Sequence, residues 1–316
     1  MQPTGRIHLG NWLGALQNWV RLQDEYECFY FIADYHSFTV PGDHSALART
    51  VEDVALDWLG AGLDPQRSVL FVQSDVPQVA ELDLLLGMTT PLSWLERVPT
   101  YKEKVEQFPE AVSYGLLGYP VLQAADILLY QGERVPVGED QLPHLELTRE
   151  IARRFNHHYG HVFVEPQALV TPTPRVMGTD GVTKMSKSRG NVIEVYWEPE
   201  QIRHVVHSMV TDVQRPRRHD PGHPEHCNVC QLHRIFTPDG WEQIWDGERT
   251  ARTGCTDVKA MLADAIATYF APMRERRREL AARPGLVREV LGDGAQRAGR
   301  IAAETVASVR VAMGID

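Results

Sequence analysis

The sequence lacks any run of about 20 consecutive apolar residues, the length that a membrane-spanning helix needs. Its first ten residues, MQPTGRIHLG, also lack the charged and then apolar build of a signal peptide. Cysteine is scarce, with 4 in 316 residues, so a disulfide framework is not expected in a chain of this size. These absences argue against a membrane protein or a disulfide-stabilised secreted protein, and they predict a cytoplasmic one.

Positive charge is not in excess either, because the net charge is −10 at pH 7. This sum excludes a surface that is basic all over, but it leaves room for a local basic patch. Arginine is concentrated late in the chain, at 214–219 and 273–284, in runs that are most often solvated helix faces. The candidates for phosphate contacts with an RNA are Arg274, Arg276, Arg277 and Arg278.

The pattern of apolar residues divides the chain near residue 195. Before it, predicted elements alternate, with helices at 9–25, 46–60 and 78–87 and strands at 28–34, 69–73 and 134–137. Such alternation predicts an α/β fold with a parallel sheet covered by helices on both faces. After it, strands fade and long helical stretches follow at 199–210, 256–280 and 297–314. We therefore expect an α/β domain over 1–195 and an all-helical domain over 196–316.

Two segments have the properties of a phosphate-binding site. Residues 3–14, PTGRIHLGNWLG, place glycines, His8 and Asn11 at the start of the first predicted helix, where free N–H groups favour an anion. Taken alone, one histidine at such a position is more often a packing residue. Far downstream, Lys184 and Lys187 flank a Met-Ser pair, and two neighbouring lysines repel each other until an anion neutralises them. Together the two segments predict a phosphate-rich ligand.

The two segments also resemble the paired signature of class I aminoacyl-tRNA synthetases. HLGN at 8–11 matches its first member, HxGN, and KMSKS at 184–188 matches the second letter for letter. The resemblance implies that ATP and Mg²⁺ bind here, and that Lys184, Lys187 and Mg²⁺ neutralise the departing pyrophosphate when an amino-acid carboxylate attacks the α-phosphorus. The implied catalytic residues are His8, Asn11, Lys184, Ser186 and Lys187.

The segment 118–130, GYPVLQAADILLY, is the most informative one for the substrate. We expect Pro120 to begin a helix on which Tyr119, Gln123 and Asp126 share one face, at i, i+4 and i+7. Spacing alone leaves open whether this polar stripe faces solvent or lines a pocket. In a pocket, the Asp126 carboxylate needs a donor such as an indole N–H or a phenol hydroxyl, and a substrate without one is rejected strongly.

The same segment, followed by VPVGEDQLPHLELTREIARRFN at 135–156, is similar to the bacterial tryptophanyl-tRNA synthetase family, over nearly the whole chain. The similarity implies ATP-dependent activation of L-tryptophan to tryptophanyl-adenylate and its transfer to tRNA(Trp). It implies a homodimer in which each chain has a Rossmann-like catalytic domain with a dimer-forming insertion and a helical anticodon-binding domain, the last helix packing back on the catalytic domain. The implied tryptophan contacts are Tyr119, Gln123, Asp126 and Gln141. The implied ATP contacts are Gln2, Thr4, Gly10, Asn11, Gly138, Asp140, Lys184, Met185 and Lys187.

Two alternatives stay open at this point. Tyrosyl-tRNA synthetases share the fold, the signature motifs and a pocket aspartate, although the AADILLY and VPVGEDQ segments favour the tryptophan branch. The second alternative is a non-catalytic paralogue that binds RNA or protein. Family members usually carry a strand before the PTG turn, and here Met1 stands only two residues ahead of Pro3, which favours that alternative. The intact phosphate-binding segments speak against it.

The late cysteines resemble the remnant of a metal site. A bacterial subgroup of the family binds a four-iron cluster through four cysteines, and this chain matches it at Cys227 and Cys255 but carries Glu248 and Val258 at two of the cysteine positions. An iron–sulfur cluster is therefore not expected. Zinc has suitable ligand types in Cys227, Cys230, Cys255 and either His226 or His233. A remnant without metal is the preferred interpretation, and Cys28 is expected to be a core residue.

Overall fold

The structure is a computed structural model that describes residues 1–39, 42–170 and 176–315. The chain begins with a continuous helical segment made of α1 (Leu9–Asn11), a π-helical turn (Trp12–Leu16) and α2 (Gln17–Leu22). The helices that follow, up to residue 159, are α3 (Leu47–Ala61), α4 (Gln78–Gly87), α5 (Leu92–Leu95), α6 (Pro99–Gln107), α7 (Tyr114–Leu128) and α8 (Leu142–Tyr159). The later helices are α9 (Pro199–Ser208), α10 (Asn228–Phe236), α11 (Trp241–Arg249), α12 (Cys255–Tyr269), α13 (Ala271–Ala281) and α14 (Leu286–Met313).

The strands form two parallel pairs. β1 (Cys28–Ile32) pairs with β2 (Ser68–Val72), with Cys28 opposite Ser68, and β3 (Arg134–Val137) pairs with β4 (Gln167–Val170). The main chain of Met1 lies beside β1, since its N–H donates to Phe31 O at 2.8 Å and its carbonyl accepts from Ala33 N at 2.9 Å. Parallel strands joined through helices match the expected α/β class.

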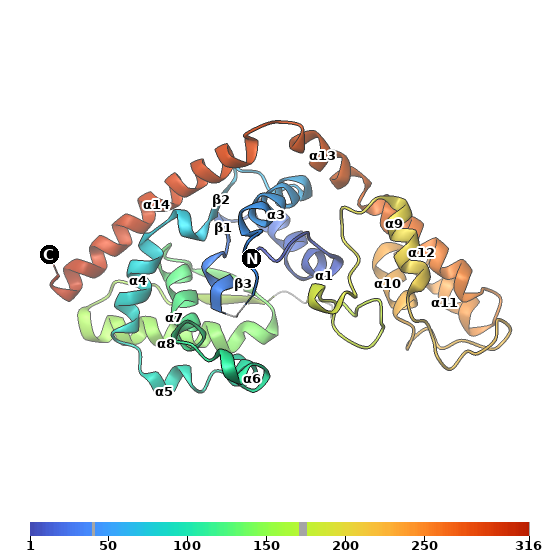
Figure 1. The fold of residues 1–316 in the computed structure, drawn as a ribbon, viewed down its shortest axis with the longest axis horizontal. Helices are drawn as coiled ribbons and strands as arrows, with labels where there is room; N and C mark the ends of the chain where they lie inside the picture. Colours follow the sequence, from blue (N-terminus) through green and yellow to red (C-terminus); the bar gives the residue numbers. More distant parts are fainter. Residues whose placement is uncertain (40–41, 171–175, 316) are drawn as a thin grey trace.

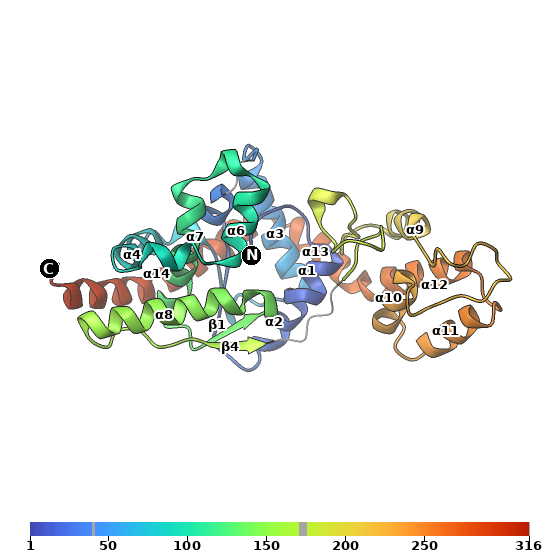
Figure 2. The same ribbon diagram turned by 90° about the horizontal axis from the view of Figure 1, so that it is seen from below.

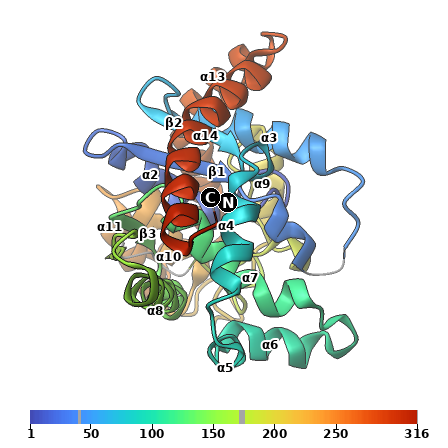
Figure 3. The same ribbon diagram turned by 90° about the vertical axis from the view of Figure 1, so that its left-hand side faces the viewer.

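The last helix runs back over the strands. Every residue of β2 is buried, and α14 lies across this strand with α4 beside it (Figure 3). The approach depends on Gly294, because a Cβ at that position would lie 1.8 Å from the carbonyl oxygen of Leu70. Helices α9 to α12 gather at the opposite end of the molecule (Figures 1 and 2). Among the described residues, no helix is both long and apolar enough to cross a bilayer.

Most of the predicted helices and strands are present in the structure, but some of their ends differ from the prediction. The three predicted strands are present to within two residues, whereas β4 was not predicted. The single helix predicted at 256–280 is divided at Phe270, because Pro272 lies in the first turn of α13. The prediction that Pro120 begins a helix is wrong. α7 starts six residues earlier, where the Ser113 hydroxyl accepts from Leu116 N at 3.1 Å and caps the helix.

The buried carboxylate of Asp57 connects α3, α13 and the segment before α1. Asp57, on α3, accepts hydrogen bonds from Ile7 N at 2.9 Å and from Arg277 Nε at 2.5 Å, and the Tyr196 hydroxyl donates to its carbonyl oxygen. Because an uncompensated buried charge is strongly destabilising, this pairing ties α13 firmly to α3 and to the PTG turn.

Of the arginines of α13, Arg274 is buried and Arg277 is half-buried, whereas Arg276 and Arg278 are exposed. Arg277 also pairs with Asp53 at 2.8 Å, and Arg274, which is buried, donates to Ala267 O at 2.6 Å. Arg276 Nη1 lies 3.4 Å from Gly60 O, and Arg278 pairs with glutamates at the surface. Each of the four candidates for RNA contacts therefore already has an acceptor in this structure.

Candidate active site

A cavity of about 530 Å³ opens beside the carboxyl ends of β1 and β3. In parallel α/β sheets this end is where ligands bind. Three elements contribute most of its polar groups: α7, the 3₁₀ turn at Tyr35–Thr39 and the start of α8. Its apolar wall comes mainly from the β-strands. The lining residues used below are Gln2, Phe29, Phe31, His36, Lys104, Tyr119, Gln123, Asp126, Val135, Val137, Gly138, Gln141 and His144.

Asp126 lies at the buried end of this cavity, with 5% of its surface exposed. Its Oδ2 is 2.7 Å from His36 Nε2, and its Oδ1 accepts from Gln73 Nε2 at 2.7 Å. An ionised carboxylate has about four lone-pair positions, so these two bonds leave capacity for a donor from a ligand. The sequence predicted Asp126 but neither of its partners, which lie 90 and 53 residues away along the chain.

The negative charge of Asp126 also acts on the carboxyl group of Asp83, on α4. Burial first, and then the negative charge of Asp126, raise the pKa of Asp83 to about 6. Asp126 thus brings negative charge to the end of the cavity, which favours a ligand with an N–H or O–H donor.

Tyr119 lies about two turns before Asp126 on the same face of α7. Its hydroxyl is 2.8 Å from Nε2 of His144, and Lys104 Nζ lies 5.0 Å from the centre of its ring. Burial lowers the pKa of His144 and that of Lys104. The imidazole is therefore neutral near pH 7 and orients the Tyr119 hydroxyl. His144 and Lys104 are pocket residues that the sequence did not single out.

The predicted residues at the start of the chain form the cap of α1. His8 is the N-cap: its Nδ1 accepts from Gly10 N at 3.1 Å, and its own N–H donates to the side chain of Asn11 at 3.2 Å. Burial, followed by the positive charges of Lys187 and Lys184, lowers the pKa of His8 to about 4. Since Nδ1 accepts a hydrogen bond, Nε2 of the neutral ring carries the proton and can donate to a ligand.

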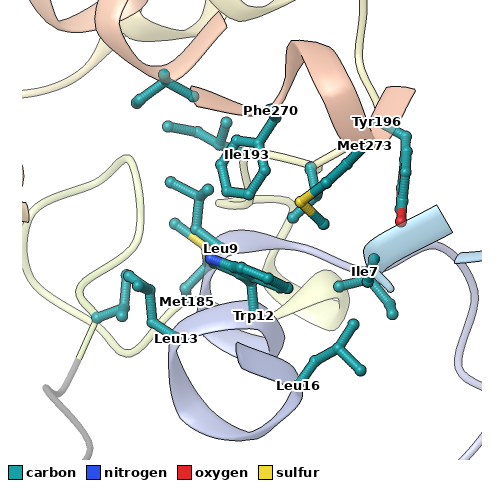
Figure 4. Close-up of a cluster of buried hydrophobic side chains, with 14 of the residues drawn as sticks. Ile7, Leu9, Trp12, Leu13, Leu16, Met185, Ile193, Tyr196, Phe270 and Met273 are labelled. Carbon is teal, nitrogen blue, oxygen red and sulfur yellow. The ribbon is translucent and has the colours of Figure 1, made fainter. Parts of the chain in front are cut away.

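The lysine segment, KMSKS at 184–188, and the residues that follow it up to 194 pack directly on the start of α1. Leu9 N donates to Ile193 O at 2.9 Å, and residues 8 and 194 form an antiparallel bridge. Met185 is buried in the same cluster as Leu13 and Trp12, where the Trp12 ring lies edge to face with that of Phe270 (Figure 4). The two predicted phosphate-binding segments, about 175 residues apart in sequence, thus lie in contact.

Lys187 reaches across to the PTG turn. Its Nζ lies 3.5 Å from the place where a Cβ on Gly5 would stand, and Gly5 has a φ of +103°, which only glycine adopts readily. Burial lowers the pKa of Lys187. An anion bound between Lys187 and the start of α1 would relieve this cost of desolvation.

Seven of the nine expected nucleotide contacts are not among the residues that line the cavity. Thr4 and Asp140 are exposed, and Asp140 Oδ2 accepts from Gln141 Nε2 at 3.0 Å. Gln2, Gly138 and Gln141 do line the cavity. All four predicted tryptophan contacts therefore line the cavity, whereas most of the predicted nucleotide contacts do not.

The pKa of His8 leads to a testable dependence of stability on pH. Below about pH 6.5 the unfolded chain takes up a proton at this residue, whereas the folded chain does so only near pH 4, so stability falls as the pH falls through this window. We expect wild type to lose about 1 to 2 kcal/mol more than His8→Asn between pH 7 and pH 5, measured by urea unfolding. Asparagine keeps a good N-cap without titrating. His204→Asn, at an exposed position on α9, should lose as much stability as wild type. Equal losses for His8→Asn and wild type would contradict the lowered pKa of His8.

The late cysteines do not assemble a metal site in the described part of the chain, where no group of three or more His, Cys, Asp or Glu side chains is placed to hold an ion. Cys227 and Cys230 are buried, and Glu248, at one of the expected cysteine positions, is also buried and pairs with Arg215 Nη1 at 2.5 Å. His233 uses both ring nitrogens, towards Thr237 Oγ1 and Val258 O. Cys28 is a buried residue of β1.

Comparison with known proteins relates this geometry to a family. A family model described as class I tRNA synthetases (W and Y) matches residues 1–271. A tryptophan--tRNA ligase of Thermotoga maritima is 46% identical over 321 residues, which span 100% of this chain and 98% of that protein. A tryptophan--tRNA ligase of Aquifex aeolicus is 42% identical, with the same coverage of both chains.

Solved structures show the same relationship. The tryptophanyl-tRNA synthetase of Campylobacter jejuni, complexed with ADP and tryptophan, superposes with a TM-score of 0.89 and 36% identity, over 99% of this chain and 98% of that one. A tyrosyl-tRNA synthetase of Archaeoglobus fulgidus has a TM-score of 0.67 and 22% identity, over 88% of each chain, and shows a shared fold alone.

Proposed function

Because this chain belongs to the class I tRNA synthetases for tryptophan and tyrosine, we propose that it activates L-tryptophan with ATP and transfers it to tRNA(Trp). The observation that carries this proposal is the cavity that ends at the buried, hydrogen-bonded Asp126 and is lined in part by Gly14, the last residue of the first phosphate-binding segment. The relatives favour tryptophan over tyrosine, and they do not favour a non-catalytic paralogue.

The amino acid fits the cavity with its indole inward. The indole N–H donates to Asp126, whose position is held by His36 and Gln73. Phe29, Phe31, Val135 and Val137 supply apolar surface for the ring, and Tyr119, Gln123 and Gln141 supply polar groups for the amino group and carboxylate. A ring without a donor would leave Asp126 desolvated and unpaired, which is the basis of the discrimination.

The nucleotide fits between α1 and the lysine segment. The Nε2 proton of His8, at the start of α1, faces the phosphates, and Lys184 and Lys187 close on them from the other side. As the tryptophan carboxylate attacks the α-phosphorus, negative charge grows on the leaving pyrophosphate, where both lysines stabilise it. Phosphate oxygens are preferred ligands of Mg²⁺, which adds positive charge there when bound and needs no protein carboxylate cage.

The activity is tested by tryptophan-dependent exchange of labelled pyrophosphate into ATP, with tyrosine in a parallel reaction. We expect exchange with tryptophan alone, and charging of tRNA(Trp) in a second assay. Exchange with tyrosine instead would assign the chain to the other branch of its family, and no exchange with either amino acid would favour the non-catalytic alternative.

Residues 196–316 are proposed to carry the anticodon-binding function. Helices α9 to α12 project beyond the catalytic region and are available to a long RNA (Figure 2). Arg277 of α13 is engaged with Asp53 and Asp57, and Arg274 with a main-chain oxygen, so we place the tRNA surface on α9 to α12 instead. A cytoplasmic location accords with this role.

We further propose that the chain forms a homodimer through the exposed apolar residues at α4, α5 and the start of α7. Met88 is 71% exposed and Tyr114 is 79% exposed, and the Tyr114 hydroxyl lies close to Gly87. Leu84 and Leu92 are exposed nearby on α4 and α5. Exposed apolar side chains on neighbouring elements mark an interaction surface, and α5 lies at an edge of the molecule (Figure 3).

Disrupting this patch is expected to produce monomers. Met88→Glu places a charge at the centre of the apolar contact, where it cannot be solvated in the dimer. Sedimentation equilibrium should show the mass of a dimer for wild type and about half that mass for Met88→Glu. Met261→Glu, at an exposed apolar position on α12, should remain dimeric. A dimeric Met88→Glu would place the interface elsewhere.

A further inference from the structure

Residues 177–191 form a hairpin that carries Lys184 and Lys187, with an antiparallel bridge between Met177 and Lys184. We propose that Asp180 and Asn191 are positioning residues that hold this hairpin in the geometry required for adenylate formation. Neither contributes a group to the cavity. The inference rests on the proposed function, because it assigns these two residues to the step in which the lysines act.

The Asp180 carboxylate is the hydrogen-bond centre of the hairpin. Its Oδ1 accepts from Val182 N at 2.9 Å and Thr183 N at 3.0 Å. Its Oδ2 accepts from Thr183 Oγ1 at 2.6 Å and Asn191 Nδ2 at 2.8 Å. These bonds hold the pKa of Asp180 well below its usual range, so the charge is present at any assay pH.

Asn191 connects this centre to the backbone around Met185. Only 4% of Asn191 is exposed; its Oδ1 accepts from Ser186 N at 2.8 Å and its Nδ2 also lies 3.4 Å from Lys184 O. The fit is close, because a Cβ at residue 178 would lie 2.0 Å from Asn191 Nδ2, and Gly178 has none. The buried amide therefore holds the chain on both sides of Met185.

Three contacts then determine where the lysines point. Asn191 holds the carbonyl of Lys184 and the amide of Ser186, and the buried Met185 anchors the turn beside Gly10. Lys187 follows at once, as the first residue of a 3₁₀ turn (Lys187–Arg189). Loss of the Asp180–Asn191 pair frees this segment, and a displacement of about 1 Å in a positioned group can cost about 100-fold in rate.

The chemistry of the pair allows a rescue experiment. In Asp180→Asn, the new amide group must face either Asn191 Nδ2 or the N–H groups of Val182 and Thr183, so donor meets donor. In Asn191→Asp, two carboxylates face each other. The double substitution D180N/N191D restores the hydrogen bond between the two side chains, because an amide at 180 donates to a carboxylate at 191 that still accepts from Ser186 N; the weaker contact with Lys184 O, at 3.4 Å, is not restored.

Pyrophosphate exchange should be measured for wild type, both single variants, the double variant and Asp264→Asn, which removes an exposed carboxylate paired with Arg203 on the surface. We expect each single variant to lower kcat by about 10-fold to 100-fold, with KM for tryptophan within about twofold of wild type. The double variant should recover most of the rate, and Asp264→Asn should match wild type.

Amide hydrogen exchange in residues 182–187 tests the same idea without activity. The single variants should exchange faster than wild type at this segment, and the double variant should return towards wild type. The inference is overturned if Asp180→Asn keeps full rate and protection, if the double variant is no better than the singles, or if tryptophan binding is lost together with the rate. A wild type that lacks exchange activity would count against the proposed function, whereas the protection data would still decide this inference.

Discussion

Replacing Lys187 with alanine is expected to lower tryptophan-dependent pyrophosphate exchange by about 100-fold to 1,000-fold, with little change in KM for tryptophan. Its ammonium group lies at the PTG turn, beside the start of α1, and is partly desolvated there. The charge is worth most when negative charge grows on the leaving pyrophosphate, so the loss should appear in kcat. Initial rates at saturating tryptophan and varied ATP would measure it.

Arg189→Ala is the matched control for this substitution. Arg189 lies in the same 3₁₀ turn and carries the same charge, but its side chain is exposed. We expect its removal to change exchange by less than about threefold, since exposed charges are screened by solvent and salt. Equal losses in the two variants would mean that the net charge of the loop matters and that the placement of Lys187 does not.

Asp126→Asn is expected to lower kcat/KM for tryptophan by about 1,000-fold. The carboxylate accepts from His36 on one oxygen and from Gln73 on the other, and the indole N–H would be a third donor. An asparagine keeps one acceptor but turns an NH₂ group towards these donors. One buried donor is then left facing another, which costs more than the loss of a single hydrogen bond.

Asp75→Asn serves as the comparison, because Asp75 is an exposed carboxylate in the turn (Gln73–Asp75) that carries Gln73. It should leave exchange close to wild type. Measuring tryptophan affinity by calorimetry alongside the rates separates lost binding from lost catalysis. An Asp126→Asn enzyme with normal kcat/KM would show that the indole nitrogen is recognised by another group.

Local patterns in the sequence were sufficient to predict several features of this protein. The alternation of strands and helices predicted the α/β class, and the predicted strand at 134–137 coincides with β3. The helical spacing of Tyr119, Gln123 and Asp126 placed them on one face of α7, where all three line the cavity. The glycine-rich start of α1 and the paired lysines indicate a phosphate site from chemistry that each segment carries within about 12 residues, and this site stays a prediction. Such features depend on neighbours in the chain, and periodicity records them directly.

Other features followed only from packing. His36 and Gln73 meet Asp126, and His144 meets Tyr119, across 25 to 90 residues of chain, and no spacing rule predicts such contacts. The arginines of α13 have the composition of an RNA-binding face, but α13 packs on α3 and turns Arg277 towards the buried Asp57. A side chain's neighbours along a helix are set by a repeat of 3.6 residues, whereas its partners on other elements are set by how whole helices and strands pack, which no short window of residues specifies.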